Sequence, residues 1–562
     1  MLRNKMMVSV KRILIAVYAT LLYVITTSTL YCGDSQQQFH IMQAFDVYGN
    51  AIKQILNNSL YDVEVDSLLC KSMEGMMSYL DPYAEYFTAE EDNEMSIVAT
   101  GKYFGYGFGF RNINSQMVIT VIRSNSPAAN AGIVIGDIIY SVDSTIITDV
   151  EQLDRLLLAS SDETLFRIIR RGVSDTLSFI ASKDTINIQS VTIYKLLSGN
   201  IGYIKLEQFT ANSYFEFRDA FYALSKHGVM DGLVVDLRGN GGGILQEATK
   251  IVNMFIPINS PIVATKGKGK DEIRVYRAIF QPVDTTLSLV VLIDEESASA
   301  SELMAGCLQD LDRATIAGNT SFGKGLVQEV FDLNYNRLMK MTTARYYTPS
   351  GRCIQKIDYN ENKEWRQKQK IGKNVYSPLS TPSPNKNEID TASIGSEHIF
   401  YTHSGRKVYE QNGIIPDVFI AGDSITSKLA MELIASYTIF DFANYYCNTN
   451  LIDSNGFDAD EVYTNFVSYV CDSDRAYLSA IQLLDSLISI STTSNEQAIL
   501  SNTKAALTKE YREYLFTDAI TKQEITRQLV LAIKYRLLSA SQFYNYILQE
   551  DIVVRKATEL LK

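Results

Sequence analysis

A buried strand that leads through a serine-rich turn into a helix constrains this chain more than any other feature. The apolar run LSLVVLI ends at Ile293, and a helical pattern then reaches Leu311. Between them lie three serines, Ser297, Ser299 and Ser301. Catalytic and binding residues concentrate on turns that a rigid scaffold holds in place. A junction of this kind projects a small hydroxyl side chain at the edge of a sheet, so the serines are candidate site residues.

A lysine between two glycines follows this junction. Lys324 lies in the motif Phe-Gly-Lys-Gly, and a strand-like run continues from Leu326 to Leu333. With the period of two that strands have, Lys324, Leu326 and Gln328 project to one face. The pattern therefore predicts that the amide of Gln328 reaches the amine of Lys324.

A serine hydroxyl is a weak nucleophile until a neighbouring base takes its proton. The chain has only four histidines, none of them in this region. A buried lysine can replace histidine if its pKa falls toward neutrality, and Ser-Lys pairs are a known variant of the catalytic triad. The residues alone leave two interpretations open. Either Ser299 attacks with Lys324 as its base, or Ser299 only caps the helix and Lys324 is a solvated loop residue.

The blocks SASASE, LQD, FGKGLVQ and RYYTPSGR resemble, in order and spacing, the C-terminal processing peptidases. These are Ser-Lys serine proteases of family S41 that contain a PDZ domain. The resemblance implies Ser299 as the nucleophile, Lys324 as the general base and Gln328 as the residue that positions the lysine.

A second strand-to-turn junction has a glycine-rich turn. The segment GLVVDLRGNGGG, Gly232 to Gly243, has the pattern of a buried strand that opens into a turn, and a strand and a helix precede it at 201–226. This order predicts an α/β layer with ligand groups at the carboxyl ends of its strands. A tetrahedral acyl intermediate needs backbone N–H donors for its oxyanion. The resemblance implies that Gly243 and Ala300 supply them. A phosphate-binding loop is the competing interpretation, but the run lacks the following Lys-Ser/Thr.

Several residues near these motifs are interpreted as structural. Asp236 and Arg238 are expected to pair and fix the glycine turn, and Asp310 of the LQD block is read as support for the site. The six cysteines have no pairing rhythm that indicates a disulfide framework. Cys307 is expected to be a small core residue.

A glycine-rich turn also opens a second domain. Gly105-Tyr106-Gly107-Phe108 leads into a strand, and SPAANAGIVIGDIIYSVD follows. The whole region resembles a PDZ domain. Successive backbone N–H groups in such a turn can hold a free carboxylate, while an open sheet edge accepts a peptide as an extra strand. Tyr106, Gly107 and Phe108 are therefore the expected carboxylate-binding loop.

Composition bounds the remaining choices. A chain of 562 residues exceeds one core and predicts three to five domains. Its 46% hydrophobic and 21% charged residues are typical of globular proteins. The net charge of -12 and the pI near 5.1 argue against a nucleic-acid binder. No zinc-ligand spacing appears, and we expect no metal and no cofactor.

The N-terminus has the form of an export signal. Basic residues up to Arg12 precede an apolar stretch from Ile13 to about Val24. The stretch could also remain uncut as a membrane anchor. Cys32 suggests a lipoprotein cleavage site, although Tyr31 stands where such sites prefer a small residue. In each case we expect the folded part outside the cytoplasm, in the bacterial periplasm or cell envelope.

The predicted fold class is multidomain α+β, with a helical pattern from Gln38 to about Met95 and four helices beyond Ser424 (Leu429 to Ala443, Arg475 to Ile490, Thr503 to Leu515 and Ile520 to Leu548). The domains are 1–34, a signal peptide or membrane anchor; 35–95, a helical N-terminal segment; 96–185, the PDZ domain; 186–423, an α/β protease core of the S41 (ClpP/crotonase-like) type with an exposed insertion at 356–404; and 424–562, a helical C-terminal domain.

The resulting functional prediction is an exported serine endopeptidase. It would recognise the tails of unfolded or tail-exposed protein substrates through the PDZ domain and cut them by an acyl-enzyme mechanism. A linker around 181–190 would let the PDZ domain rotate, so that a bound peptide shifts Lys324 into line with Ser299. The alternative is a non-catalytic PDZ scaffold with a degenerate protease core. Expected partners are the substrates, further copies of the chain bound through terminal helices, and an adaptor or activator protein.

Overall fold

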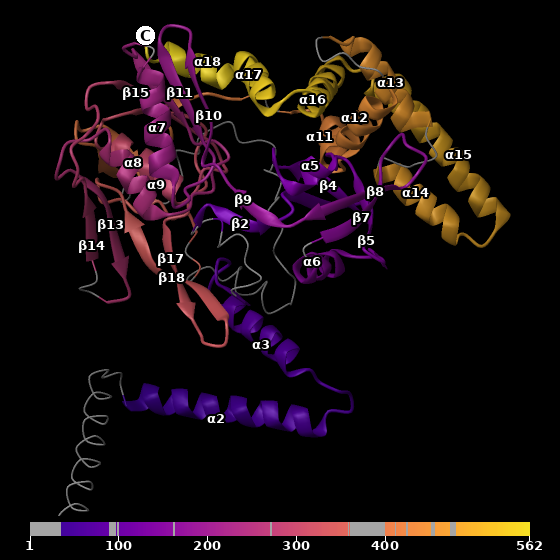
Figure 1. Cartoon of the computed structure of the whole chain (residues 1–562), viewed down its shortest axis with the longest axis horizontal. Coiled ribbons are helices and arrows are strands. Elements are labelled where there is room, and N and C mark those ends of the chain that lie inside the picture. The colour runs from indigo at the N-terminus through magenta and orange to yellow at the C-terminus, as the bar shows by residue number, and fades with distance from the viewer. Residues whose placement is uncertain are drawn as a thin grey trace, which may run out of the picture. The chain divides into compact units, whose positions relative to one another are not determined.

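The structure, a computed structural model (Figure 1), describes residues 35–88, 97, 100–160, 163–226, 228–269, 273–357, 359, 399–410, 412–422, 425–450, 456–472 and 479–562. The predicted signal peptide or anchor and most of the predicted insertion lie outside these ranges. Within them, no helix has the length and apolarity that crossing a bilayer requires. The chain divides into two compact units, Met1–Tyr79 and Leu80–Lys562.

The first unit contains α2 (Ser35–Asn58) and all but the last residue of α3 (Val65–Leu80). Phe39, Met42 and Phe45 of α2 expose 66%, 72% and 73% of their surface. The predicted self-association through terminal helices stays a prediction.

The helix predicted to reach Met95 ends earlier than expected. Glu85–Thr88 forms a strand, β1, in the second unit, and this strand pairs antiparallel with residues 337–340. The helix was therefore predicted to be too long, because Tyr86 and Phe87 belong to a strand of a sheet and not to the helix.

The PDZ domain is an antiparallel sheet of order β3-β4-β5-β7-β8, with β6 beside β5. Ile119, Leu153 and Phe166 are fully buried in its core. The elements are β3 (Phe108–Ile113), β4 (Gln116–Ile122), α5 (Pro127–Ala131), β5 (Ile138–Val142), β6 (Thr145–Ile146), α6 (Val150–Ala159), β7 (Glu163–Ile169) and β8 (Leu177–Ser182).

The segments on either side of the PDZ domain pair with each other. β2 (Lys102–Gly105) and β9 (Asp184–Asn187) form a two-stranded antiparallel ribbon, and the amide of Ile188 donates to the carbonyl of Gly101 at 2.8 Å. The linker predicted around 181–190 is therefore mostly in strands, and the rotation that it would allow stays a prediction.

The protease core is built on a six-stranded sheet of order β10-β11-β12-β15-β16-β21. β10 is antiparallel to its neighbour and the other strands run parallel. Every residue of β12 is buried, as expected for a parallel strand that is covered on both faces. The elements are β10 (Val191–Leu197), β11 (Ile201–Leu206), α7 (Ser213–Ser225), β12 (Gly232–Asp236), α8 (Leu245–Asn253), β15 (Ser288–Ile293), α9 (Ala300–Asp310), β16 (Thr315–Gly318) and β21 (Val418–Phe419).

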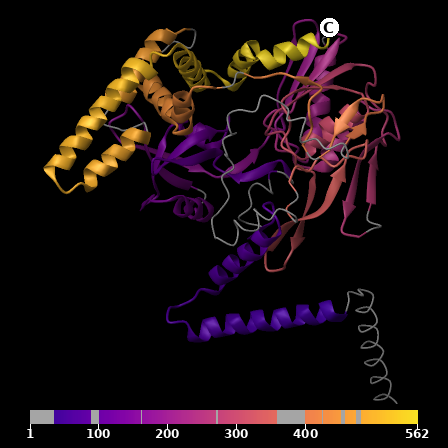
Figure 2. The same cartoon turned by 180° about the vertical axis from the view of Figure 1, so that it is seen from behind.

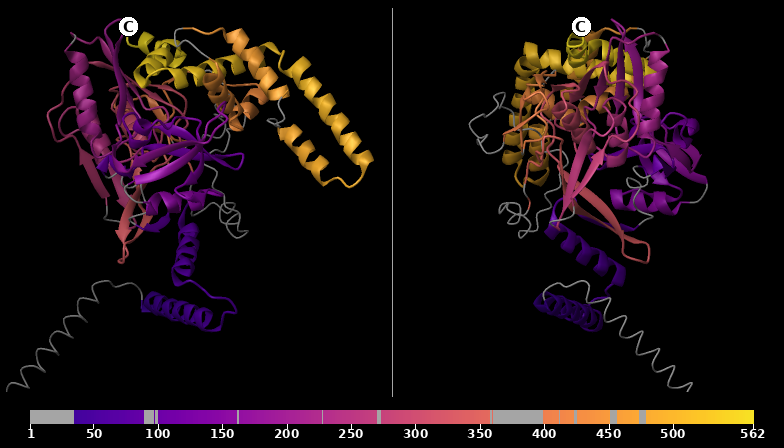
Figure 3. Two further views of the ribbon diagram at one scale, coloured as in Figure 1. Left: turned by 45° about the vertical axis from the view of Figure 1, so that its right-hand side comes forward. Right: turned by 90° about the vertical axis from the view of Figure 1, so that its left-hand side faces the viewer.

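A second, antiparallel sheet closes the other side of the site. Its order is β1-β18-β13-β14, and β17 pairs with β18 in a long ribbon (Figure 3). These strands are β13 (Pro261–Gly267), β14 (Ile273–Arg277), β17 (Leu326–Asp332) and β18 (Arg337–Tyr347), and a small pair, β19 (Ile399–Tyr401) and β20 (Lys407–Tyr409), follows.

The C-terminal domain is helical, as predicted, but has more helices than the periodicity indicated. The predicted helix from Ile520 to Leu548 is two helices, because Ser539 caps the second with a hydrogen bond from the amide of Gln542. α14 and α15 form a hairpin (Figure 2). The elements are α11 (Lys428–Ala435), α12 (Thr438–Thr449), α13 (Ala459–Asp472), α14 (Ser479–Ile490), α15 (Ser494–Glu510), η1 (Tyr511–Leu515), α16 (Ala519–Leu537), α17 (Ala540–Glu550) and α18 (Ile552–Glu559).

The last helix packs into the protease core. Val553, Val554 and Ala557 of α18 are buried against Val234 of β12 and Val290 of β15. Helices α7, α8 and α9 supply the hydrophobic cluster on the opposite face of this sheet. One face of this sheet is therefore covered by a helix that lies more than 300 residues after the strand it packs against, β12.

The aromatic cluster under α8 gives the first prediction. Phe255 is fully buried and packs edge-on against Phe217 and Phe221, whereas Phe280 is 58% exposed. Phe255→Ala is expected to lower the free energy of unfolding of the core by about 3–5 kcal/mol through lost burial and a residual cavity. Phe280→Ala should change it by less than about 0.5 kcal/mol. Urea unfolding followed by circular dichroism measures both, and equal midpoints for the two variants would contradict this packing.

Candidate active site

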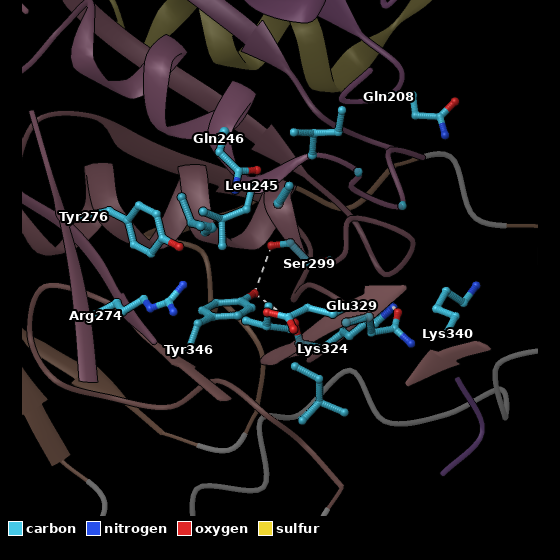
Figure 4. A pocket seen from close by; sticks show the side chains of 18 of the residues that line it. Gln208, Leu245, Gln246, Arg274, Tyr276, Ser299, Lys324, Glu329, Lys340 and Tyr346 are labelled. Atoms are coloured by element: carbon cyan, nitrogen blue, oxygen red, sulfur yellow. Dashed lines mark hydrogen bonds between the residues drawn. The ribbon is translucent and has the colours of Figure 1, made fainter. Parts of the chain in front are cut away.

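A cleft of about 700 Å³ lies where the two sheets of the core meet. Its walls come from the turn after β12, the turn between β15 and α9, the loop before β17, and strands β17 and β18 (Figure 4). The cleft brings together the five residues predicted for a protease site: Gly243, Ser299, Ala300, Lys324 and Gln328.

Of the three serines in the turn, Ser299 alone lines the cleft among the described residues. The hydroxyl of Ser297 donates to the carbonyl of Leu237 at 2.8 Å, and that of Ser301 donates to the carbonyl of Asn240 at 2.9 Å. Both side chains are fully buried. Ser297 and Ser301 thus bind the two turns together and leave Ser299 facing the cavity.

The backbone of Ser299 is strained. Its φ of 55° and ψ of -111° are rare for a residue with a side chain. Such conformations persist only where the surroundings impose them, and they cluster at functional sites. Ser299 is also the N-cap residue of α9, so the alternative interpretation as a helix cap describes its position correctly but does not account for the strain.

The glycine turn is pressed against the serine turn. A Cβ atom on Gly242 would lie 2.8 Å from Cβ of Ser299, and one on Gly243 would lie 2.1 Å from the carbonyl oxygen of Phe209. Both glycines have positive φ, at 104° and 134°. Only glycine fits these two positions, because space and backbone conformation each exclude a side chain.

Two backbone amides in the cleft are available to a ligand. Within the described part of the chain, the amides of Gly243 and Ala300 donate to no protein acceptor, and both residues line the cavity. Ala300 is the first residue of α9, where the helix dipole favours negative charge. The two amides are therefore placed to donate to an anionic oxygen next to Ser299.

Lys324 lies just before β17 and is held by Gln328. Its Nζ donates to Oε1 of Gln328 at 2.7 Å and lies 4.2 Å from the ring centroid of Tyr83. Nε2 of Gln328 donates to the carbonyl of Tyr83 at 2.8 Å. The predicted contact is present, but the predicted alternation is not its cause, since the strand is irregular between Val327 and Gln328. Tyr83 was not predicted, because its place in the site depends on a contact far apart in sequence.

The surroundings lower the basicity of the lysine. Burial lowers the pKa of Lys324, and the nearby Lys340 cation lowers it further, while Asp81 and Glu85 oppose the change. The resulting pKa is about 8, against an ordinary 10.5. About one amine in ten is then neutral at pH 7, compared with fewer than one in a thousand for a solvated lysine.

Glu302 connects the serine and the lysine. Its Oε2 accepts from the backbone amides of Ser299 at 2.8 Å and Lys324 at 2.9 Å. Its Oε1 accepts from the amide of Gly323 at 2.7 Å and the hydroxyl of Ser321 at 2.5 Å. The carboxyl is fully buried, and burial raises its pKa. Glu302 was not among the predicted site residues, although the Ser-x-x-Glu spacing of a capping box was a usable signal.

Tyr346 adds a second link. Its hydroxyl lies 2.9 Å from the carbonyl oxygens of both Ser299 and Lys324 (Figure 4). Burial raises its pKa well above the ordinary value, so the hydroxyl remains a donor at neutral pH.

The charged residues interpreted as structural are confirmed as ion pairs. Nη2 of Arg238 lies 2.6 Å from Oδ2 of Asp236 directly before the glycine turn. Burial alone would raise the pKa of Asp236, but the Lys205 and Arg238 cations hold it far below its usual range. Asp310 lies 2.8 Å from the buried guanidinium of Arg352 and does not line the cleft. Among the described residues, no three His, Cys, Asp or Glu side chains are grouped to hold a metal ion.

Part of the predicted peptide-binding loop of the PDZ domain, the side chain of Tyr106, is buried in the core of the domain. The hydroxyl of Tyr106 is bonded to those of Ser160 and Thr164, each at 2.6 Å, and the side chain is buried. Gly107 has a φ of 81°, and Phe108 begins β3, the edge strand of the sheet. A ligand at this loop would therefore meet backbone groups and an open strand edge rather than the Tyr106 side chain.

Comparison with known proteins identifies three regions. The family model of peptidase family S41 matches residues 200–362, and a PDZ domain model matches residues 118–171. A third model, described as the C-terminal helical domain of a probable PDZ-protease, matches residues 429–561. The described strands and helices agree with this division into domains.

Relatives match a longer stretch of the chain than any one of these models does. The carboxy-terminal-processing protease of Bartonella bacilliformis is 32% identical over 316 residues, which are 55% of this chain and 72% of the relative. A probable CtpA-like serine protease of Staphylococcus epidermidis is 33% identical over 309 residues, which are 54% of this chain and 62% of the relative. The solved photosystem II D1 C-terminal processing protease aligns over 67% of this chain and 87% of its own, at 24% identity and a TM-score of 0.36. From its sequence matches, the chain belongs to peptidase family S41 and, within it, to the carboxy-terminal-processing proteases.

Proposed function

We propose that the chain is a serine endopeptidase that cleaves protein substrates through an acyl-enzyme on Ser299, with Lys324 as general base and Gln328 as the residue that orients the lysine. The observation that carries the proposal is the lysine itself. A partly buried amine with a pKa of about 8, fixed by Gln328, lines the same cleft as a serine with a strained backbone. A packing role would require none of these features.

The proposed reaction uses the groups of the cleft in two steps. Neutral Lys324 takes the proton of Ser299 Oγ as this oxygen attacks the scissile carbonyl carbon. The resulting oxyanion receives hydrogen bonds from the amides of Gly243 and Ala300. The ammonium then gives its proton to the departing amine, and the C–N bond breaks. A water molecule, deprotonated by Lys324, releases the acyl group and restores the serine.

Substrate recognition is proposed to reside in the PDZ domain. β3 is an edge strand that can accept a peptide strand, and the turn at Tyr106 and Gly107 leads into it at Phe108. We propose that the free C-terminus of an unfolded or tail-exposed protein binds there, and that binding shifts the protease toward its active arrangement. The β2–β9 ribbon is the connection through which such a shift would pass.

We further propose that the chain acts in the bacterial periplasm or cell envelope. The support is the basic and apolar sequence of the first residues, which suits a cleaved signal, a retained anchor or lipidation at Cys32. We also propose that the chain assembles through its terminal helices and that an adaptor or activator protein controls its activity.

The proposed nucleophile and base are tested with an unfolded protein that has an apolar free C-terminus. Ser299→Ala and Lys324→Ala are each expected to lower the cleavage rate at least about 1000-fold, because one removes the attacking oxygen and the other its base. Amidation of the substrate tail should weaken cleavage by the wild type. Cleavage that survives Ser299→Ala would refute the assignment, and tail binding without cleavage by the wild type would favour the scaffold alternative.

The pH dependence follows from the pKa of the lysine. Only neutral Lys324 can accept a proton, so kcat/KM should rise with pH up to about 8 and level off above it. Lys340→Gln removes a cation that lowers this pKa, so the rising limb should move to higher pH. Lys428→Gln, an exposed lysine on α11, is the matched control and should leave the profile in place. A profile that is unchanged in Lys340→Gln would contradict this account of the pKa.

The Glu302 carboxylate is tested by an isosteric amide. Each of its oxygens accepts two hydrogen bonds, so Glu302→Gln turns one acceptor into a donor and leaves two buried N–H or O–H groups unpaired, at about 1–3 kcal/mol each. We expect a lower unfolding midpoint and a kcat reduced by about 10- to 100-fold. Glu496→Gln changes the same capping-box position on the exposed helix α15 and should change neither quantity. Equal effects of the two substitutions would contradict the role given to Glu302.

A further inference from the structure

The glycine turn that carries the Gly243 amide is anchored on one side by a network that ends in the C-terminal domain. Arg238, two residues after the end of β12, pairs with Asp236 at 2.6 Å. Its Nη2 also lies 2.7 Å from Oδ2 of Asp551, a residue at the junction of α17 and α18. Arg238 is thus held between a carboxylate of its own strand and one supplied from the far end of the chain.

Asp551 also organises its own helix. Its Oδ1 accepts from the amides of Val553 at 2.8 Å and Val554 at 3.1 Å, which caps the N-terminus of α18. Oδ2 makes the short contact with the guanidinium, at 2.7 Å from Nη2, whereas Oδ1 caps the helix and lies farther from the guanidinium, at 3.4 Å from Nη1. The next residues of α18, Val553 and Val554, are buried against the core sheet, so the carboxylate is fixed in place.

The network continues from Arg238 into the cleft. The Nζ of Lys205 donates to the carbonyl of Arg238, and the amide of Gly239 donates to Asp294 at 2.9 Å. The carbonyl of Asn240 accepts from the amide of Ala298, at 3.0 Å, next to Ser299. Displacement of the Arg238 side chain would remove one anchor at the start of the segment 238–243, whose other end carries the Gly243 amide.

We infer that Asp551 is a positioning residue of the active site, through which the C-terminal helical domain fixes Arg238 and thereby the turn that presents the Gly243 amide to the oxyanion. This inference rests on the proposed function of that amide. It assigns to the C-terminal domain a part in catalysis that helix packing alone would not give it. Asp551 contacts no reacting atom and acts only through Arg238.

The substitution Asp551→Asn separates the two functions of the side chain. Asparagine is as good an N-cap as aspartate, so α18 should remain capped. The amide removes the negative charge that faces the guanidinium, which is a charge-assisted contact in the wild type. Asp518→Asn is the matched control, because Asp518 caps α16 with a hydrogen bond from the amide of Thr521 at 2.9 Å and is exposed.

The expected result is a selective loss of turnover. Complete loss of an oxyanion donor costs about 100- to 1000-fold in rate, so its displacement in Asp551→Asn should lower kcat by about tenfold. KM should stay within about twofold, since ground-state binding does not use this amide. Asp518→Asn should leave both constants unchanged. A purely structural role for Asp551 would instead lower the unfolding midpoint and leave kcat of the folded enzyme intact.

A second readout does not depend on activity. Backbone amide hydrogen exchange over residues 238–244 should be faster in Asp551→Asn than in the wild type and in Asp518→Asn. Unchanged exchange together with unchanged kcat in Asp551→Asn would overturn the inference. If the wild type shows no cleavage that depends on Ser299, the proposed function fails instead, and the exchange rates alone decide whether Asp551 positions the turn.

Discussion

The active site depends on a single buried carboxylate. Glu302 accepts hydrogen bonds from the backbone on both sides of the cleft, at Ser299 and at Lys324, and no oxygen of it is left for solvent. Burying a carboxyl group is costly unless its acceptors are satisfied. Because the four donors are supplied by two separate turns, the carboxyl is satisfied only when those turns are correctly placed. The fold thus couples the geometry of nucleophile and base to the hydrogen bonding of one side chain.

Lys324 adds a second constraint, which concerns a buried amine rather than a buried carboxyl group. An amine must be buried to lose its proton near neutral pH, yet burial also disfavours placing it there. The ring of Tyr83 and the amide of Gln328 provide the contacts that make this tolerable, at 4.2 Å and 2.7 Å from Nζ. Tyr83 precedes the PDZ domain in sequence and Gln328 follows it. The pocket of Lys324 therefore forms only when the segments before and after the PDZ domain come together.

Local sequence predicted those parts of the structure that depend on local patterns. The strands before Ser299 and before the glycine turn and the helix α9 follow from apolar runs and glycines, whereas the contact of Lys324 with Gln328 was predicted from an alternation that the irregular strand does not keep. Tyr83 and Asp551 could not be found in this way, because their contacts join positions more than 200 residues apart. The break at Ser539 and the short helix α18 were missed because one is a cap inside a continuous periodic pattern and the other has only eight residues.

The central claim is that Ser299 becomes acylated during turnover, and it is tested most directly by trapping the intermediate. An activated ester or a rapidly cleaved peptide is mixed with the enzyme and quenched in acid within the first turnover, and the adduct is located by peptide mapping and mass spectrometry. The account predicts an added mass equal to the acyl part of the substrate on the peptide that contains Ser299. An adduct on another residue, or steady turnover with no adduct at any time before the quench, would contradict it.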